Sequence, residues 1–225
     1  MKKLMVFLAA AFLGSVCASA QLTFSAGWQT SQLIRTDVAS DGYRSYLYTW
    51  SQGFYAGATS SYGLGIKGLG FDYSILYSYS TGTETDALKI FDDPHYEAAK
   101  NGQVITDEHY LAVPATLRYS LGICKGLGVY VYAGPEVLYC LSSKSYSTWQ
   151  VIDGVNHWNV DHFGAGTDYI GYRRFDLGVL GGLGLEIADR IRIEGGADYG
   201  IMQKADADFL LHRLSLHAGI AYIFK

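Results

Sequence analysis

The chain has 225 residues, a formal net charge of −4, 19 Tyr, 27 Gly and 3 Pro. This mildly acidic balance provides no basic surface of the kind that binds nucleic acid, so we expect no nucleic-acid partner. The length fits one β domain, and the many tyrosines and glycines are typical of a sheet that curves and meets a membrane interface.

The first twenty residues have the features of a secretory signal peptide. Lys2 and Lys3 precede an apolar stretch, and residues 18–20 read Ala-Ser-Ala, the small-x-small pattern that signal peptidase cleaves. The apolar stretch has about ten residues, whereas a membrane-spanning helix needs about 20. We therefore predict a cleaved signal peptide over 1–20 and a single domain over 21–225, which has a net charge of −6 once the two lysines are lost.

Alternation of apolar and polar residues, the signature of a strand with two different faces, recurs along the rest of the chain. Each alternating stretch has at least the roughly 9–11 residues that a tilted strand needs to cross a bilayer. The eight predicted strands are Leu22–Gln32, Gly53–Tyr62, Leu69–Ser80, Glu108–Leu121, Leu127–Leu141, Tyr172–Ile187, Arg190–Met202 and Leu210–Phe224.

The connections between these strands alternate in length. The long ones are Leu33–Gln52, Thr81–Asp107 and Ser142–Gly171, the short ones are Gly63–Gly68, Gly122–Gly126 and Ala188–Asp189, and Gln203–Phe209 is intermediate. Short periplasmic turns opposite long external loops, with an even number of strands, are typical of transmembrane barrels. The sequence therefore predicts an all-β fold, an eight-stranded antiparallel up-and-down transmembrane β-barrel.

The two faces of the predicted strands distinguish a membrane barrel from a periplasmic β-sandwich or a lipocalin-like barrel. One face is apolar from Phe71 onward with tyrosines toward the strand ends, as in a lipid-facing band with aromatic girdles. The other mixes charges with glycines, so we expect paired charges that plug a narrow lumen, in preference to an anion site or a pore. This lumen charge network comprises Asp72, Arg118, Glu136, Arg174, Asp176, Arg192, Glu194, Asp198 and Arg213.

Two prolines and two cysteines fall within or beside the predicted strands. Pro114 and Pro135 lie mid-strand, where a missing N–H must be accommodated, and we predict β-bulges there. Cys124 and Cys140 lie near opposite ends of the strand Leu127–Leu141, roughly 50 Å apart at about 3.3 Å per residue. A disulfide tolerates only about 7 Å between Cα atoms, so we predict two free thiols.

Several strand segments resemble a known family. Tyr110–Tyr119 (YLAVPATLRY) followed by Val131–Glu136 (VYAGPE) resembles the paired "YLxIPLLLKY … AGPY" strands of the porin-family small outer-membrane β-barrel domain proteins, which include PorT-like and OmpA/OmpX-like barrels. Further similar segments are Gly53–Gly57, Tyr73–Ser78, Phe175–Gly178 and Tyr222–Phe224. The resemblance implies an eight-stranded outer-membrane barrel with prolines at two matching places. One departure is Lys225, which follows the aromatic residue at which such chains often end.

Two groups of residues have side chains that serve catalysis or metal binding in other proteins. Ser215 and His217 share a face of the last predicted strand, but no nucleophile motif surrounds them, so we expect no enzymatic activity. The third long loop contains Asp153, His157, Asp161 and His162. Their spacing matches no closed metal-binding motif, so we expect no metal and no other cofactor.

Aromatic residues in the first and third long loops are candidates for contact with a partner, although they would equally pack over the barrel mouth. They are Tyr43, Tyr46, Trp50, Trp149 and Trp158. The sequence therefore favours a monomeric, non-enzymatic outer-membrane barrel with a plugged lumen and structural, adhesive or ligand-binding external loops. Its expected partners are outer-membrane lipids and an extracellular ligand or export-machinery protein. The alternatives are a narrow pore for small solutes and an accessory role in protein export.

Overall fold

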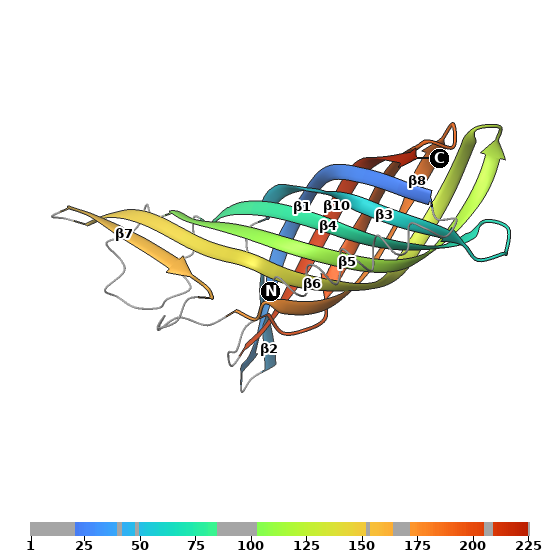
Figure 1. The fold of residues 1–225 in the computed structure, drawn as a ribbon. Coiled ribbons are helices and arrows are strands. Elements are labelled where there is room, and N and C mark those ends of the chain that lie inside the picture. Colours follow the sequence, from blue (N-terminus) through green and yellow to red (C-terminus); the bar gives the residue numbers. More distant parts are fainter. Residues whose placement is uncertain are drawn as a thin grey trace, which may run out of the picture.

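The computed structural model (Figure 1) describes residues 21–39, 42–47, 50–84, 103–151, 154–163, 172–204 and 209–224. Within these ranges the strands are β1 Gln21–Ala39, β2 Gly42–Leu47, β3 Ser51–Gly63, β4 Leu69–Glu84, β5 Gln103–Cys124, β6 Leu127–Val151, β7 Gly154–Asp161, β8 Phe175–Ile187, β9 Ile191–Gly200 and β10 Phe209–Phe224. The predicted signal peptide, residues 1–20, lies outside the described residues. No helix in the described ranges has the length and apolar character needed to cross a membrane.

Eight of the strands close into a ring. Their order is β10-β9-β8-β6-β5-β4-β3-β1, every pairing is antiparallel, and β10 pairs with β1 from Leu22↔Phe224 to Asp37↔Phe209. In the described part of the chain β2 pairs with β1 and β7 pairs with β6, so these two strands lie outside the ring. The predicted eight-stranded up-and-down barrel is confirmed.

The strands extend further on the side of the long connections than the sequence predicted. β1 runs to Ala39 and β6 to Val151, where the chain turns back as β7, so that much of the predicted loop Ser142–Gly171 is a β-hairpin. The β6 extension begins with residues 142–148, which are polar on both faces, and the β1 extension mixes apolar and polar residues, so neither shows the alternation of a lipid-facing strand. Figure 1 shows the β6–β7 hairpin projecting well beyond the ring. The predictions that residues 33–39 and 142–151 are loop were therefore wrong.

The short connections turn through backbone conformations with positive φ. Ala188 and Asp189, the predicted two-residue turn, both have φ of 53°, which is the type I′ geometry that matches the twist of paired strands. Gly126 has φ of 79° in the turn between β5 and β6. At these turns the chain reverses within a few residues, so the ring has one end of short turns and one end of long hairpins.

The two faces of the sheet differ as predicted. Large apolar side chains on the outer wall are exposed, among them Leu117, Val131 and Leu183 at 56, 57 and 67%. The alternate residues point inward, where Asp72 and Arg213 are buried. The outer apolar band also crosses β1 and β3, where the sequence shows weaker alternation; the exposed residues there are Phe24, Trp28 and Phe54.

The two mid-strand prolines do not produce bulges. The β4–β5 ladder skips two positions that include Pro114, and the β5–β6 ladder skips two that include Pro135, in both cases with unchanged register. Register shifts in β5–β6 lie instead at His109/Tyr110 and Gly122/Cys124. The bulge prediction was wrong because a local gap accommodates the missing N–H, whereas an inserted residue would have exchanged the inward and outward faces.

A small apolar cluster packs between β5 and β6 inside the barrel. It consists of Tyr110, Ala112, Leu138 and Cys140, each at most 5% exposed. Cys140 and the exposed Cys124 are free thiols, as predicted. Most of the remaining interior is polar, so the barrel is held together by hydrogen bonds and ion pairs more than by an apolar core.

Candidate functional site

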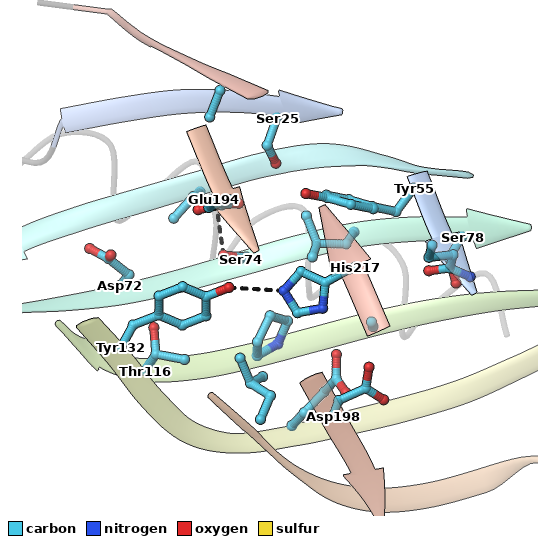
Figure 2. Close-up of a pocket in the computed structure, with 18 of the residues that line it drawn as sticks. Ser25, Tyr55, Asp72, Ser74, Ser78, Thr116, Tyr132, Glu194, Asp198 and His217 are labelled. Atoms are coloured by element: carbon cyan, nitrogen blue, oxygen red, sulfur yellow. Dashed lines mark hydrogen bonds between the residues drawn. The ribbon is translucent and has the colours of Figure 1, made fainter. Parts of the chain in front are cut away.

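The barrel lumen holds a polar cavity of about 100 Å³ (Figure 2). All eight ring strands contribute to its lining. A water molecule needs about 10–15 Å³ of such volume, so the cavity has room for several waters. Sites for small organic ligands have about 300–1,000 Å³, so the lumen is too small for a solute of that kind.

The central charge cluster forms around Arg213 of β10, which is 5% exposed. Its Nη2 donates to Oδ1 of Asp198 at 2.5 Å and lies 3.8 Å from Oε2 of Glu136. The cluster therefore links β10 to the neighbouring β9 and, across the lumen, to β6. Arg213 supplies the positive charge beside both carboxyl groups, and this contact matters because an unpaired buried charge is costly.

Two further ion pairs lie toward the end of short turns. Arg118 Nε donates to Asp72 Oδ2 at 2.8 Å, and Arg192 Nε donates to Glu186 Oε2 at 3.1 Å. Both guanidinium groups lie beside the ring of Tyr130, at 6.0 and 5.6 Å from its centroid. The ring occupies the space between the two pairs, so this part of the lumen is filled by side chains.

Tyrosines and a histidine fill the middle of the lumen. Tyr130 donates to Glu194 Oε2 at 2.9 Å, and the Tyr132 hydroxyl is hydrogen-bonded to His217 Nε2 at 2.9 Å (Figure 2). Tyr55 packs edge-on against His217, with ring centroids 5.9 Å apart. The sequence prediction named charges only and missed these tyrosines. Their signal was present, because Tyr130 and Tyr132 alternate with the outward valines of β6.

Another buried ion pair lies toward the end of the long hairpins. Lys204 Nζ donates to Glu108 Oε1 at 2.5 Å, and the two side chains are 5 and 7% exposed. Ser143 donates to the same oxygen at 3.1 Å, and Lys204 Nζ lies 5.0 Å from the centroid of the Tyr172 ring. The sequence prediction missed this pair, because Lys204 belongs to a connection and has no strand periodicity.

His162 follows β7 and fixes the base of the β6–β7 hairpin to the barrel, at the barrel end from which the long hairpins extend. Its ring stacks on Tyr172 with centroids 4.2 Å apart, and its Nε2 is hydrogen-bonded to Ser145 Oγ at 2.8 Å. Burial lowers the pKa of His162, although the nearby Glu108 carboxylate opposes that shift. The imidazole is therefore neutral near pH 7 and packs as an uncharged ring.

Most of the predicted lumen charges are brought together inside the ring. Those that line the cavity or pair with a residue that does are Asp72, Arg118, Glu136, Arg192, Glu194, Asp198 and Arg213. Asp176 is buried and accepts the Met202 N–H at 3.2 Å. Arg174 lies elsewhere: it donates to the carbonyl oxygens of Cys140 and Leu141 and covers the Phe163 ring at 3.9 Å. The difference arises because β8 begins at Phe175, so residue 174 precedes the alternation.

Ser215 and His217 both lie on the inner face of β10. The Ser215 side chain is 1% exposed, and its Oγ has no hydrogen-bond partner within the described residues. His217 is engaged with Tyr132. His217 lines the cavity, Ser215 is buried beside it on the same face, and both lie on the opposite side of the wall from the exposed apolar surface.

The predicted contact aromatics all belong to segments beyond or at the rim of the ring. Tyr43 and Tyr46 lie in β2, Trp149 in β6 and Trp158 in β7, and the side chains of these four are outside the described part of the structure. Trp50 immediately precedes β3 and is partly buried. The described residues contain no group of three or more His, Cys, Asp or Glu side chains arranged to hold a metal ion, and Asp153 is not among the residues described.

Comparison with known proteins identifies one family and several solved structures of low sequence identity. Residues 18–205 match the model of a family described as outer membrane protein beta-barrel domain. No curated protein sequence matches the chain.

Three solved structures illustrate the distant similarities. The attachment invasion locus protein Ail of Yersinia pestis, in complex with the heparin analogue sucrose octasulfate, is 14% identical over 91% of this chain and 99% of its own, with a TM-score of 0.45. The outer membrane protein OprG from Pseudomonas aeruginosa is 11% identical over 91 and 96%, with a TM-score of 0.49. The outer membrane enzyme PagL is 12% identical over 85 and 97%, with a TM-score of 0.43.

Proposed function

The chain belongs to the outer membrane protein beta-barrel domain family, and from that membership we propose that it acts as a non-enzymatic surface protein of the outer membrane. Its working surface is the set of hairpins beyond the ring, with a structural, adhesive or ligand-binding role. Export proceeds through the signal peptide expected over residues 1–20. The partners are outer-membrane lipids and an extracellular ligand.

The observation that carries this proposal is the contrast between the lumen and the hairpins. The lumen cavity measures about 100 Å³ and is crossed by buried ion pairs, whereas the β6–β7 hairpin extends far beyond the ring (Figure 1). β7 uses one edge to pair with β6, and no strand pairs with its other edge within the described residues. Such an edge presents backbone N–H and C=O groups that a partner chain can bind.

Two alternative functions, a narrow pore and an accessory role in protein export, would use different parts of the barrel. A narrow pore needs a continuous water path, and the buried Glu136 Oε2 and Arg213 Nε, which have no hydrogen-bond partner within the described residues, provide polar atoms along such a path. An accessory role in protein export, as the PorT-like resemblance implies, would use the hairpins as the contact surface for another protein. We favour the closed lumen because the pairs around Arg213 and Lys204 occupy both the middle and the mouth.

The closed lumen predicts that the protein conducts no ions. In planar lipid bilayers the full chain is expected to show no reproducible open-channel steps, because an eight-stranded interior is only wide enough for its own side chains. As a matched control, a variant with Tyr55, Tyr130 and Tyr132 all replaced by alanine removes three rings around the cavity and is expected to leak. Regular conductance steps from the unaltered protein would contradict the closed lumen.

The hairpin role predicts that shortening β6–β7 removes surface contact without unfolding the barrel. Tyr146 pairs with Asn159, so replacing residues 147–158 by Asn-Gly forms a two-residue turn in the existing register. Cells that display this variant are expected to lose adhesion to surfaces that cells displaying the unaltered protein bind, while the protein retains its heat-dependent gel mobility. A control variant with a Gly-Ser stretch of equal length at 147–158 separates the effect of sequence from that of length. Unchanged adhesion in both variants would count against this role.

A further inference from the structure

An apolar groove of about 900 Å³ crosses the outer wall of the barrel from β9 to β5. Its floor consists of three alanines, Ala26 of β1 and Ala56 and Ala58 of β3, with the backbone of Gly57 between them. The strand register places Ala26 directly beside Ala56, so the small residues of two neighbouring strands form one depression. Larger side chains border it, including Ile220 on β10, which is 56% exposed.

Aromatic rings bound the groove at both of its ends. On the side of the short turns, Phe24 packs edge-on against Phe224 with centroids 5.4 Å apart, and Tyr222 packs against the same ring at 4.9 Å. On the side of the hairpins, Phe54 lies 6.3 Å from Tyr77. Because aromatic residues gather where a bilayer meets water, these two clusters indicate that the groove lies within the hydrocarbon layer.

A hydrogen-bonded polar cluster adjoins the hairpin end of the groove. Tyr77, which lines the groove, is hydrogen-bonded to His109 Nδ1 at 2.6 Å. Tyr79 and Tyr146 donate to the two carboxylate oxygens of Asp107, at 3.1 and 2.9 Å. All of these side chains belong to the outer wall of β4, β5 and β6. The surface therefore changes from apolar floor to aromatic rim to polar cluster within a few strand positions.

We propose that this groove is a lipid site that holds an acyl chain of an outer-leaflet lipid, whose headgroup contacts the polar cluster of Asp107 and His109. The volume lies within the roughly 300–1,000 Å³ of small-molecule sites, and an amphiphile matches a groove that is apolar along its length and polar at one end. Hydroxyl, amide or ammonium groups of a headgroup can donate to the Asp107 carboxylate, and hydroxyl groups can also exchange hydrogen bonds with His109 and the tyrosines.

A second copy of the chain fits this surface less well than a lipid. A symmetric contact between two copies sets the same patch of each subunit against the other. Two concave alanine floors facing each other would leave an unfilled space between them, and such voids forfeit packing contacts. An acyl chain is flexible and enters the depression from the surrounding bilayer.

The test uses the full chain in lipid nanodiscs that contain phosphatidylethanolamine with a photoactivatable acyl chain. Cross-links are expected to concentrate on 24–28 and 54–58, and Ala26→Leu with Ala56→Leu is expected to lower them roughly fivefold, which corresponds to about 1 kcal/mol. Ala133→Leu, another exposed alanine of the outer wall, serves as the matched control and should change nothing. All three positions are exposed on the outer wall, so neither variant should affect folding.

Three results would overturn the assignment. The first is labelling spread evenly around the ring, which would indicate ordinary bilayer contact. The second is labelling that the two leucine substitutions leave unchanged. The third is chemical cross-linking of two copies through 24–28 and 54–58, which would assign the depression to another copy of the chain. For the headgroup, Asp107→Leu should also lower the cross-link yield, and an unchanged yield would refute the contact with the polar cluster.

Discussion

Replacing Arg213 with methionine is expected to lower the free energy of unfolding by about 3–5 kcal/mol, the usual cost of removing one partner from a buried ion pair. Methionine keeps much of the side-chain volume but leaves Asp198 and Glu136 without a countercharge inside the lumen. Their mutual repulsion and their lost solvation both oppose folding. Urea titration of the protein in lipid vesicles, followed by gel mobility without boiling, measures the change.

A neutralised variant distinguishes the effect of charge from that of packing. Combining Arg213→Met with Asp198→Asn and Glu136→Gln removes all three charges at once, and replacing a whole buried ion cluster by neutral groups is often close to neutral for stability. We expect this triple variant to recover more than half of the loss. Equal instability of the single and triple variants would show that Arg213 acts through shape and packing.

The substitution Gly27→Ala is expected to impair closure of the ring. A Cβ at this position would overlap the Ala218 carbonyl oxygen and would lie 2.6 Å from the Tyr55 ring. The first contact is with the backbone of β10, so a change of side-chain conformation cannot relieve it. Overpacking of this kind costs about 1–3 kcal/mol or more. The measurement is the fraction of protein that attains the compact, heat-modifiable form after refolding into vesicles.

Gly63→Ala provides the matched control. Gly63 is also a strand glycine, but a Cβ built there meets no atom within 4 Å, so this variant should refold like the parent protein. If Gly27→Ala refolds equally well, then the β1–β10 seam can widen enough to accept a methyl group, and the close fit around Tyr55 is not needed for closure.

The sequence was sufficient to predict the ring but not its extensions. Inside the bilayer each strand must be apolar on one face, so alternation from Phe71 onward identified both the strands and their orientation. Beyond the bilayer that requirement ends. Residues 142–148 read Ser-Ser-Lys-Ser-Tyr-Ser-Thr and are polar on both faces, although β6 continues through them because β5 and β7 supply backbone partners. Hydrogen bonding to a neighbouring strand leaves no periodic mark in the sequence.

For the lumen, the sequence predicted which residues point inward and could not predict their partners. Alternate residues of a strand point inward, which places Arg118 and Asp72 inside the ring. The two are 46 residues apart in the sequence, and only the β4–β5 register makes them a pair. Arg213 meets Glu136 because the curvature of the ring brings β6 within reach of β10 across the lumen, with β9 and β8 between them. Lys204 enters the lumen from a connection between strands, where the alternation of inward and outward residues does not apply.

The pairing of β1 with β10 also determines when the barrel can form. These are the first and last of the described strands, so a growing chain has no partner for β1 on that side until β10 has been made. Until then the sheet has two open edges with unpaired backbone groups and is prone to pair with other chains. Contacts so distant in sequence also make folding slow. The β1–β10 pairing therefore makes closure of the ring a late step, and the earlier strands have to remain unpaired with other chains until β10 is available.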